Sequence, residues 1–325
     1  MKRILITGAS GFIGSHLVEL FVEKGYKVIA FDRYNTSNNW GWLENSKYKN
    51  DFEMVLGDIR DYDSVFNVVK KSNTVIHLAA LIGIPYSYIS PLAYTRTNID
   101  GTYNILEASK QSNVDQTIIT STSEIYGTAK YIPIDELHPA NAQSPYAASK
   151  IAADQLALSY YRSYNLPLKI IRPFNTYGPR QSARAIIPTI IPQMLNKKKF
   201  ILLGNTFTKR DLTYVSEVCS AFFEVFKCSK LLGETVNVGT NKSVAIKELV
   251  FYLNKILDTK TKIKIDKKRQ RPKKSEVLNL VCNNKKLIKT TKWKTKINIK
   301  LGLERTLLWF QDPENLKNYK YQYNI

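Results

Sequence analysis

The sequence predicts an α/β fold in which a doubly wound parallel sheet is joined to a smaller mixed α/β C-terminal lobe. Two observations support this fold class. An apolar run at residues 3–7 leads through a glycine-spaced turn into a segment with helical periodicity, which predicts a strand–turn–helix unit. Short apolar strands and longer helices then alternate up to residue 173, an order that favours a parallel sheet covered on both faces. We therefore expect a Rossmann-type domain over residues 1–173, rejoined by about 205–235, and a second lobe over 174–325.

The individual elements follow from hydrophobic periodicity and from the residues that start or stop each run. In the first domain, strands are expected at residues 3–7, 27–32, 54–57, 74–78, 116–120 and 168–172, and helices at 15–24, 93–111 and 145–164. Gly25 is expected to cap the first helix, and Ser144-Pro145 to begin the last one. In the looser second lobe we expect helices at 188–196, 246–257 and 301–311 and a strand at 235–238.

The turn Gly8-Ala-Ser-Gly11-Phe-Ile-Gly14 is the first functional signal. Its three glycines let the backbone turn sharply and bring N–H groups, together with the following helix N-terminus, against a pyrophosphate. Asp32 ends the second strand, where a carboxylate would hold the ribose hydroxyls of a dinucleotide and repel a 2′-phosphate. NAD is therefore expected, although the adjacent Arg33 leaves NADP open. The turn residues expected to contact the cofactor are Gly8, Gly11, Phe12, Ile13 and Gly14.

Further cofactor contacts are expected where the other strands end. Asp58 follows the third strand and could hold the adenine amino group, and the small pair Ala79-Ala80 after the fourth strand would let a cofactor lie close. The complete set expected in these positions is Asp58, Ile59, Leu78, Ala79, Ala80, Asn98 and Pro173.

The catalytic chemistry is predicted from residues 120–127 and from Tyr146 and Lys150. Because Tyr146 and Lys150 are four residues apart, they share one helix face, and an ammonium beside a phenol favours the phenolate. A free phenol titrates near ~10, so this help would let tyrosine act as a base near neutral pH. A Tyr-x-x-x-Lys pair alone is common on helix surfaces, so the prediction depends on the glycine turn and on Thr122-Ser123-Glu124 after a strand.

Charge and composition exclude several classes of function. The net charge is +21, and residues 255–300 hold seventeen Lys/Arg against three Asp/Glu. Such density attracts polyanions, but the lysines are spread through apolar sequence without a nucleic-acid-binding signature, so a solvated surface or a cleft for a diphosphate is favoured. No apolar run is long enough for a membrane span, and the chain enters its first strand without a signal peptide, so we expect a cytoplasmic protein. The scattered histidines and three cysteines predict no metal site.

Four motifs together resemble the extended short-chain dehydrogenase/reductases of the NAD-dependent epimerase/dehydratase family, which act on nucleotide sugars. They are residues 7–14, 77–80, the Tyr146/Lys150 pair and residues 172–179, and the resemblance covers nearly the whole chain. More narrowly, residues 38–43, 84–87, 120–127, 178–184 and 271–276 resemble the NDP-N-acetylglucosamine 4,6-dehydratases of legionaminic acid synthesis. This narrower resemblance implies GDP- or UDP-N-acetylglucosamine as the substrate and a 4-keto-6-deoxy sugar as the product.

The resemblance also implies a role for each catalytic residue. Tyr146 would take the proton of the sugar C4 hydroxyl while NAD accepts the C4 hydride, Lys150 would hold the nicotinamide ribose, and Thr122 would hydrogen-bond O4. Glu124 would then remove the C5 proton as the C6 hydroxyl leaves, after which NADH returns its hydride to C6.

Ser123 departs from the wider dehydratase pattern, in which an aspartic acid at this position protonates the leaving hydroxyl. Serine is a poor general acid, so Ser123 could relay a proton or position O6, or Glu124 could serve both steps. The same Ser-Glu pair occurs in UDP-glucuronate decarboxylases, an alternative in which Arg180 or Arg184 would bind the substrate carboxylate. An NDP-sugar 4-epimerase is a further alternative, although it would need no base at position 124.

Substrate and partner contacts are implied by the same resemblance. Diphosphate binding falls to Asn175, Arg210 and Arg271, whose guanidinium forks suit phosphate oxygens, while Tyr86 and Ser87 approach the hexose. Helices 93–111 and 145–164 are those through which related enzymes pair in a four-helix bundle, so a homodimer is expected.

Overall fold

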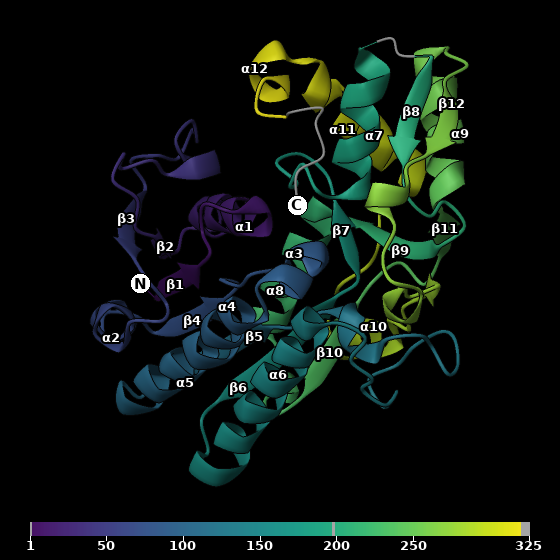
Figure 1. The fold of residues 1–325 in the computed structure, drawn as a ribbon. Helices are drawn as coiled ribbons and strands as arrows, with labels where there is room; N and C mark the ends of the chain where they lie inside the picture. Colours follow the sequence, from purple (N-terminus) through teal and green to yellow (C-terminus); the bar gives the residue numbers. More distant parts are fainter. Residues whose placement is uncertain (1, 197–198, 320–325) are drawn as a thin grey trace.

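The computed structural model describes residues 2–196 and 199–319 and contains the expected parallel sheet. Seven strands lie in the order β10-β6-β5-β4-β1-β2-β3, all of them parallel to their neighbours (Figure 1). The strand order reverses between β1 and β4, and such a switch point opens a crevice at the carboxyl ends of the strands. The strands are β1 (Arg3–Thr7), β2 (Lys27–Arg33), β3 (Phe52–Gly57), β4 (Thr74–His77), β5 (Gln116–Thr120), β6 (Leu168–Pro173) and β10 (Thr235–Val238).

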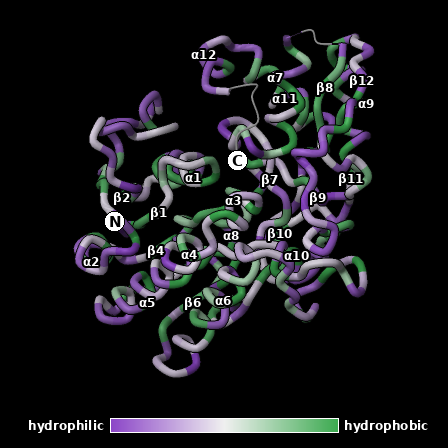
Figure 2. The backbone as a smooth tube through the Cα atoms, viewed as in Figure 1, coloured by the Kyte–Doolittle hydropathy of each residue, from purple (hydrophilic) through white to green (hydrophobic). Residues whose placement is uncertain are grey.

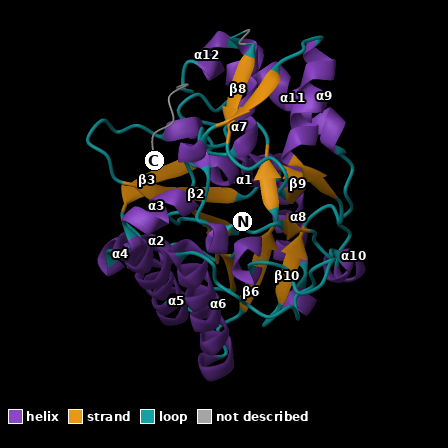
Figure 3. Ribbon diagram, turned by 45° about the vertical axis from the view of Figure 1, so that its right-hand side comes forward, coloured by secondary structure: helices purple, strands orange, loops and turns teal. Residues whose placement is uncertain are grey.

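Helices cover both faces of this sheet, which confirms the predicted doubly wound class (Figure 3). In β1, Ile4 and Ile6 face one apolar core while Leu5 faces the other, as the two-residue period of a strand requires. Helices α1 (Phe12–Glu23) and α8 (Val215–Lys227) pack on the first face, and α2 (Tyr62–Val69), α5 (Gly101–Gln111) and α6 (Pro145–Tyr164) pack on the second. Figure 2 shows hydrophobic colouring along the central strands and hydrophilic colouring on the peripheral helix α12 (Pro313–Leu316).

Helices α2 and α8 were not predicted, and two predicted elements of this domain differ from the structure. The expected helix over 93–111 is divided into α4 (Pro91–Tyr94), a π-helical segment at Thr95–Asp100 and α5, and a short α3 (Ile84–Ile89) precedes it. The strand at 235–238 was expected in the second lobe, but β10 hydrogen-bonds to β6 and so extends the main sheet. The local sequence could not predict this placement, because a short apolar strand does not indicate which strand it will pair with.

The second lobe is built on small sheets and four main helices. Strands β7 (Asn175–Tyr177), β11 (Ser243–Ala245) and β13 (Asn279–Leu280) all pair with β9 (Lys209–Tyr214). The second sheet is the parallel pair β8 (Phe200–Leu203) and β12 (Lys262–Ile265). The helices are α7 (Ile186–Leu195), α9 (Ile246–Leu257), α10 (Lys285–Thr290) and α11 (Ile299–Gln311). Across residues 2–196 and 199–319, no helix has the length and apolarity needed to cross a bilayer.

The glycine turn after β1 is packed so closely that side chains are excluded from it. A Cβ on Gly14 would lie 2.0 Å from the carbonyl oxygen of Gly8, and one on Gly8 would lie 2.9 Å from the backbone nitrogen of Ala79. Gly8 also has a φ of +67°, a conformation that favours glycine. These contacts bring α1, the turn and the end of β4 together at the switch point.

We expect Gly14→Ala to lower the free energy of unfolding by on the order of 3 kcal/mol, because the new methyl group meets rigid backbone. Gly25→Ala is the matched control: Gly25 has a φ of +79° but nothing within 4 Å of an added Cβ. Its cost should be only the backbone strain, about 1 kcal/mol. Urea denaturation of both variants measures the difference. Equal losses in the two variants would contradict the close packing described for Gly14.

Candidate active site

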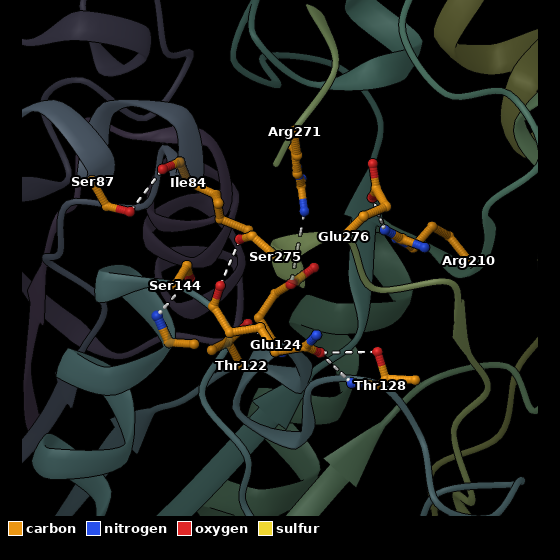
Figure 4. Close-up of polar contacts among 12 residues, drawn as sticks. Ile84, Ser87, Thr122, Glu124, Thr128, Ser144, Arg210, Arg271, Ser275 and Glu276 are labelled. Carbon is orange, nitrogen blue, oxygen red and sulfur yellow. Dashed lines mark hydrogen bonds and ion pairs between the residues drawn. The ribbon is translucent and has the colours of Figure 1, made fainter. Parts of the chain in front are cut away.

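The predicted catalytic segment lies at the carboxyl end of β5, where it forms a 3-10 helix at Ser123–Tyr126. Thr122 caps this helix, and its Oγ1 accepts the Glu124 N–H at 3.3 Å. The facing helix α6 begins as predicted, because the Ser144 Oγ accepts the Ala147 N–H at 3.1 Å and Pro145 occupies the first turn. Two capped helix starts therefore meet at one point (Figure 4).

The helix face that carries Tyr146 and Lys150 packs directly against residues 120–122. The Lys150 Nζ donates to the Thr120 carbonyl oxygen at 2.6 Å, and a side-chain hydrogen bond joins Tyr146 to Thr122. One turn further along, the Ser121 Oγ donates to Asp154 Oδ2 at 2.6 Å. The three predicted residues are thus brought together. Asp154 was missed by the sequence analysis, although its position four residues after Lys150 was a usable signal.

Burial controls the protonation of this group. Desolvation raises the pKa of Tyr146 well above its ordinary value and is opposed by the hydrogen bond to Thr122, while the Glu124 carboxylate raises that pKa further. Burial lowers the pKa of Lys150, and the Asp154 carboxylate raises it. Burial is the largest of these influences on the Tyr146 pKa, and the expected depression of that pKa by the Lys150 ammonium is not among them.

Glu124 faces two arginines across the site (Figure 4). The Arg271 Nη1 lies 4.0 Å from Glu124 Oε2, and the Arg210 Nη2 lies 3.5 Å from Glu276 Oε1. Burial lowers the pKa of the Arg210 guanidinium, and the charge of Arg271 lowers it further. Within the part of the chain that the structure describes, the Arg271 Nη1 is buried and has no hydrogen-bond partner. A guanidinium with a buried N–H group that lacks an acceptor suits an anionic ligand.

The segment that carries Arg271 is held to the first domain by a polar clamp. The Ser275 Oγ donates to the Gln143 carbonyl oxygen and accepts from the Tyr88 hydroxyl, both at 2.5 Å. The Gln143 Nε2 in turn donates to the Lys274 carbonyl oxygen at 2.8 Å. Segments from α3, from the loop before α6 and from the second lobe therefore meet beside Glu124.

The predicted cofactor residues surround the switch point, at the ends of β1, β2, β3 and β4. The Asp32 carboxylate accepts the Ser10 N–H at 2.6 Å and so ties the glycine turn to β2. The Thr7 Oγ1 accepts the backbone N–H groups of Leu78 and Ala79, both at 3.2 Å. The remaining predicted positions lie at element ends or beside them: Gly11, Phe12, Ile13, Ile59, Ala80 and Pro173. The glycine turn has no room for a Cβ at Gly8 or Gly14, and the Asp32 carboxylate lies beside it; this arrangement fits a dinucleotide.

Two of these cofactor residues are engaged by neighbouring protein groups. Asp58 forms an ion pair with Arg60 at 2.5 Å, which lowers the pKa of the carboxyl, beside a depression of about 360 Å³. Asn98, on the π-helical segment, accepts the Leu81 N–H at 2.8 Å and donates to the Leu81 carbonyl oxygen at 3.0 Å and to the Ser149 Oγ at 2.9 Å. Asn98 therefore shapes the loop after β4 from within.

The predicted substrate residues divide into two groups. Arg180 forms a bidentate pair with Glu19 on α1, with both N–O distances at 3.0 Å, so the structure does not offer it as the carboxylate-binding cation. Ser87 is fully buried, and its Oγ donates to the Ile84 carbonyl oxygen at 2.7 Å, so its hydroxyl supports α3 from inside.

Tyr86 and Arg184 lie near Tyr94, whose ring packs against that of Tyr146. The Tyr86 ring lies 6.2 Å from that of Tyr94, which in turn lies 6.2 Å from Tyr146. Burial raises the pKa of Tyr94 to about 12, and the opposing influence of the Arg184 charge places Arg184 on the same side. Asn175, on β7, keeps a buried Oδ1 without a partner among the described residues.

A family model described as GDP-mannose 4,6 dehydratase matches residues 5–306. The chain belongs to this family. A putative UDP-glucose 4-epimerase of Methanocaldococcus jannaschii is 33% identical, over 95% of this chain and 98% of the relative. The human dTDP-D-glucose 4,6-dehydratase is 30% identical, over 98% of this chain and 92% of the relative.

Solved structures show the same fold. DesIV, a dTDP-glucose 4,6-dehydratase from Streptomyces venezuelae solved with NAD, superimposes with a TM-score of 0.89 at 26% identity. The match covers 98% of this chain and 99% of that protein. The fold and the family are thus those of NAD-dependent nucleotide-sugar dehydratases and epimerases.

In a plot of rate against pH, the acidic half-maximum of Thr122→Val should lie about one pH unit higher than that of the parent enzyme. The reason is that the hydrogen bond that lowers the Tyr146 pKa is lost. Thr117→Val is the matched control: Thr117 lies on β5 with a buried Oγ1 that has no partner among the described residues. Rates measured across pH for both variants test this. An unmoved acidic half-maximum in Thr122→Val would contradict the assigned hydrogen bond.

Proposed function

We propose that this chain is an NAD-dependent nucleotide-sugar 4,6-dehydratase that acts on GDP- or UDP-linked N-acetylglucosamine. The observation that carries the proposal is the placement of Glu124. Its carboxylate is held in the same capped turn as Thr122, close enough to Tyr146 to influence its pKa, and its Oε2 lies 4.0 Å from the Arg271 Nη1. An oxidation at C4 needs only Tyr146 and Lys150, so a carboxylate in this position supports a second step.

The residues divide that chemistry between C4 and C5. Tyr146 takes the proton of the C4 hydroxyl, Lys150 holds the ribose of the nicotinamide, and Thr122 hydrogen-bonds O4. A bound NAD would supply the hydride acceptor for C4 and, once reduced, the hydride donor for C6. Between those transfers Glu124 removes the C5 proton, which the new ketone has acidified, and the C6 hydroxyl departs as water. When the hydride reaches C6, C5 takes up a proton, which balances the proton that Tyr146 took from O4, so the product is a 4-keto-6-deoxy sugar and one water.

We assign protonation of the leaving hydroxyl to Glu124 as well. Ser123 is only 2% exposed, and a serine hydroxyl is too weak an acid for the step. Glu124 is neighbour to the reacting carbons in this assignment and gains the C5 proton immediately before the hydroxyl leaves. Ser123 then has the role of orienting O6.

The nucleotide diphosphate is proposed to bind between the two lobes, on Arg210, Arg271 and Asn175. Arg271 and Asn175 each hold a buried polar atom without a partner among residues 2–196 and 199–319, which supports their role as ligand contacts. Tyr86 and Arg184 are proposed to face the hexose. The N-acetyl group and the pathway to legionaminic acid rest on the narrower sequence resemblance.

We further propose that the protein is a cytoplasmic homodimer that pairs through α5 and α6. Large apolar side chains on and beside these helices are exposed in the single chain: Leu92 is 59% exposed, Tyr103 is 45% and Tyr164 is 55%. Pairing two such surfaces would bury them in a four-helix bundle.

Incubation of the purified protein with NAD and with UDP- or GDP-N-acetylglucosamine should give a product that has lost one water, detected by mass spectrometry. UDP-glucuronate, dTDP-glucose and UDP-glucose are the comparison substrates. Loss of carbon dioxide from UDP-glucuronate would favour the decarboxylase, and an unchanged mass with inverted C4 would favour the epimerase. Water loss from a glucose nucleotide alone would retain the dehydratase and reject the N-acetylglucosamine assignment.

Glu124→Gln should allow C4 oxidation but stall the elimination, because an amide cannot take the C5 proton. The expected result is reduced cofactor on the enzyme, seen by its absorbance, with product formation lowered by about 100-fold or more. Glu224→Gln is the control, since Glu224 on α8 pairs only with Lys227 among the described contacts. Undiminished turnover by Glu124→Gln would rule out the role given to Glu124.

A further inference from the structure

Helix α6 presents three polar side chains to the catalytic segment at regular four-residue intervals. Tyr146 meets Thr122, the Lys150 Nζ donates to the Thr120 carbonyl oxygen, and Asp154 accepts from the Ser121 hydroxyl. Residues four apart lie one above the other on a helix, so these contacts form three successive rungs. The first two rungs belong to the chemistry already described. The third, Asp154, has no role in it.

Asp154 is the hub of a buried hydrogen-bond network. It is 1% exposed, and its Oδ2 accepts from the Ser121 Oγ at 2.6 Å, from the Arg172 Nε at 3.1 Å and from the Arg172 Nη2 at 3.0 Å. The Arg172 Nη1 donates to the Tyr126 hydroxyl at 3.0 Å, which donates to the Asn237 Oδ1 at 2.8 Å. The network therefore grips the catalytic segment at both ends, at Ser121 and at Tyr126.

Because Lys150 is buried, the charge of Asp154 affects the protonation of Lys150. Lys150 is 4% exposed, and burial disfavours its ammonium form. The ionisable groups that interact electrostatically with Lys150 include Asp154 on α6 and His77 on β4, and Arg172 on β6 pairs with Asp154. Burial and the Lys150 charge lower the pKa of His77 to about 3, so His77 stays neutral. Asp154 is the group whose charge raises the pKa of Lys150.

We propose that Asp154 is a positioning residue that keeps Lys150 protonated and holds the 121–126 segment in register with α6. A neutral hydrogen-bonding residue at 154 could hold Ser121, but it could not stabilise a buried ammonium. The proposal rests on the proposed function only for C4 oxidation, a half-reaction that the dehydratase, decarboxylase and epimerase alternatives share.

The proposal predicts the direction of a pH shift. Asp154→Asn keeps an acceptor for Ser121 and Arg172 but removes the charge, so Lys150 should lose its proton at a lower pH. The alkaline limb of C4 oxidation should therefore move downward by about one pH unit. Ser121→Ala is the matched control, because it removes one hydrogen bond and leaves the charge. Its alkaline limb should stay where that of the parent enzyme lies.

The first experiment follows C4 oxidation across pH by the absorbance of the reduced cofactor. A downward shift in Asp154→Asn, restored by Asp154→Glu and absent in Ser121→Ala, supports the proposal. An alkaline limb that stays in place in Asp154→Asn would overturn it and leave Asp154 a purely structural role.

A second measurement needs no substrate and so separates this proposal from the proposed function. Because burial depresses the Lys150 pKa in the folded state, unfolding stability rises with pH between the folded and unfolded pKa values. In Asp154→Asn the folded-state pKa of Lys150 is lower still, so the stability of the variant begins to rise at a lower pH than that of the parent enzyme. The difference in unfolding free energy between parent and Asp154→Asn should therefore shrink as pH rises from 7 toward the Lys150 pKa of the folded parent. A deficit that does not vary with pH rejects the proposal. If Asp154→Asn fails to fold, the double variant with Arg172→Gln takes its place, with the same expected trend relative to Arg172→Gln alone.

Discussion

Desolvation of ionisable side chains where α6 meets the end of β5 is the constraint on which the site depends. Tyr146, Lys150 and Asp154 are all less than 10% exposed, and a buried charge without partners would cost more than the domain can offset. Each side chain is therefore committed to a fixed partner in the catalytic segment. The pairings that make burial tolerable also fix the distance between the two halves of the site.

The glycine turn after β1 allows close packing of the backbone at the switch point. Gly14 and Gly8 let the start of α1 approach β1 and the end of β4 more closely than any side chain would allow. Asp32 binds the turn through the Ser10 N–H and fixes its position relative to β2. A dinucleotide laid along this turn would extend toward Lys150. The glycine turn and α6 would then contact the same ligand.

The sequence predicted most of the main sheet because local signals sufficed. Helix α6 runs over 145–164 as expected, since a serine cap and a first-turn proline mark its start. Helices α2 and α8 were not predicted. Strand β10 was assigned to the wrong lobe, because the sheet that a strand joins depends on partners far away in the chain. Residue type and spacing singled out Thr122, Tyr146 and Lys150, and the structure places them where α6 meets the end of β5; their catalytic roles stay a prediction.

Side-chain partners within the site were beyond the reach of the sequence. Arg180 and Arg184 looked equivalent as candidate cations, yet packing of α1 against the loop after β7 pairs Arg180 with Glu19. Arg271 instead approaches Glu124 on a segment that the Ser275 clamp holds to the first domain. If the substrate diphosphate binds Arg271 as proposed, phosphate oxygens replace Glu124 as the main counter-ion of that guanidinium. Glu124 is then released to act on C5 only when a nucleotide sugar is in place, which couples binding in the second lobe to chemistry in the first.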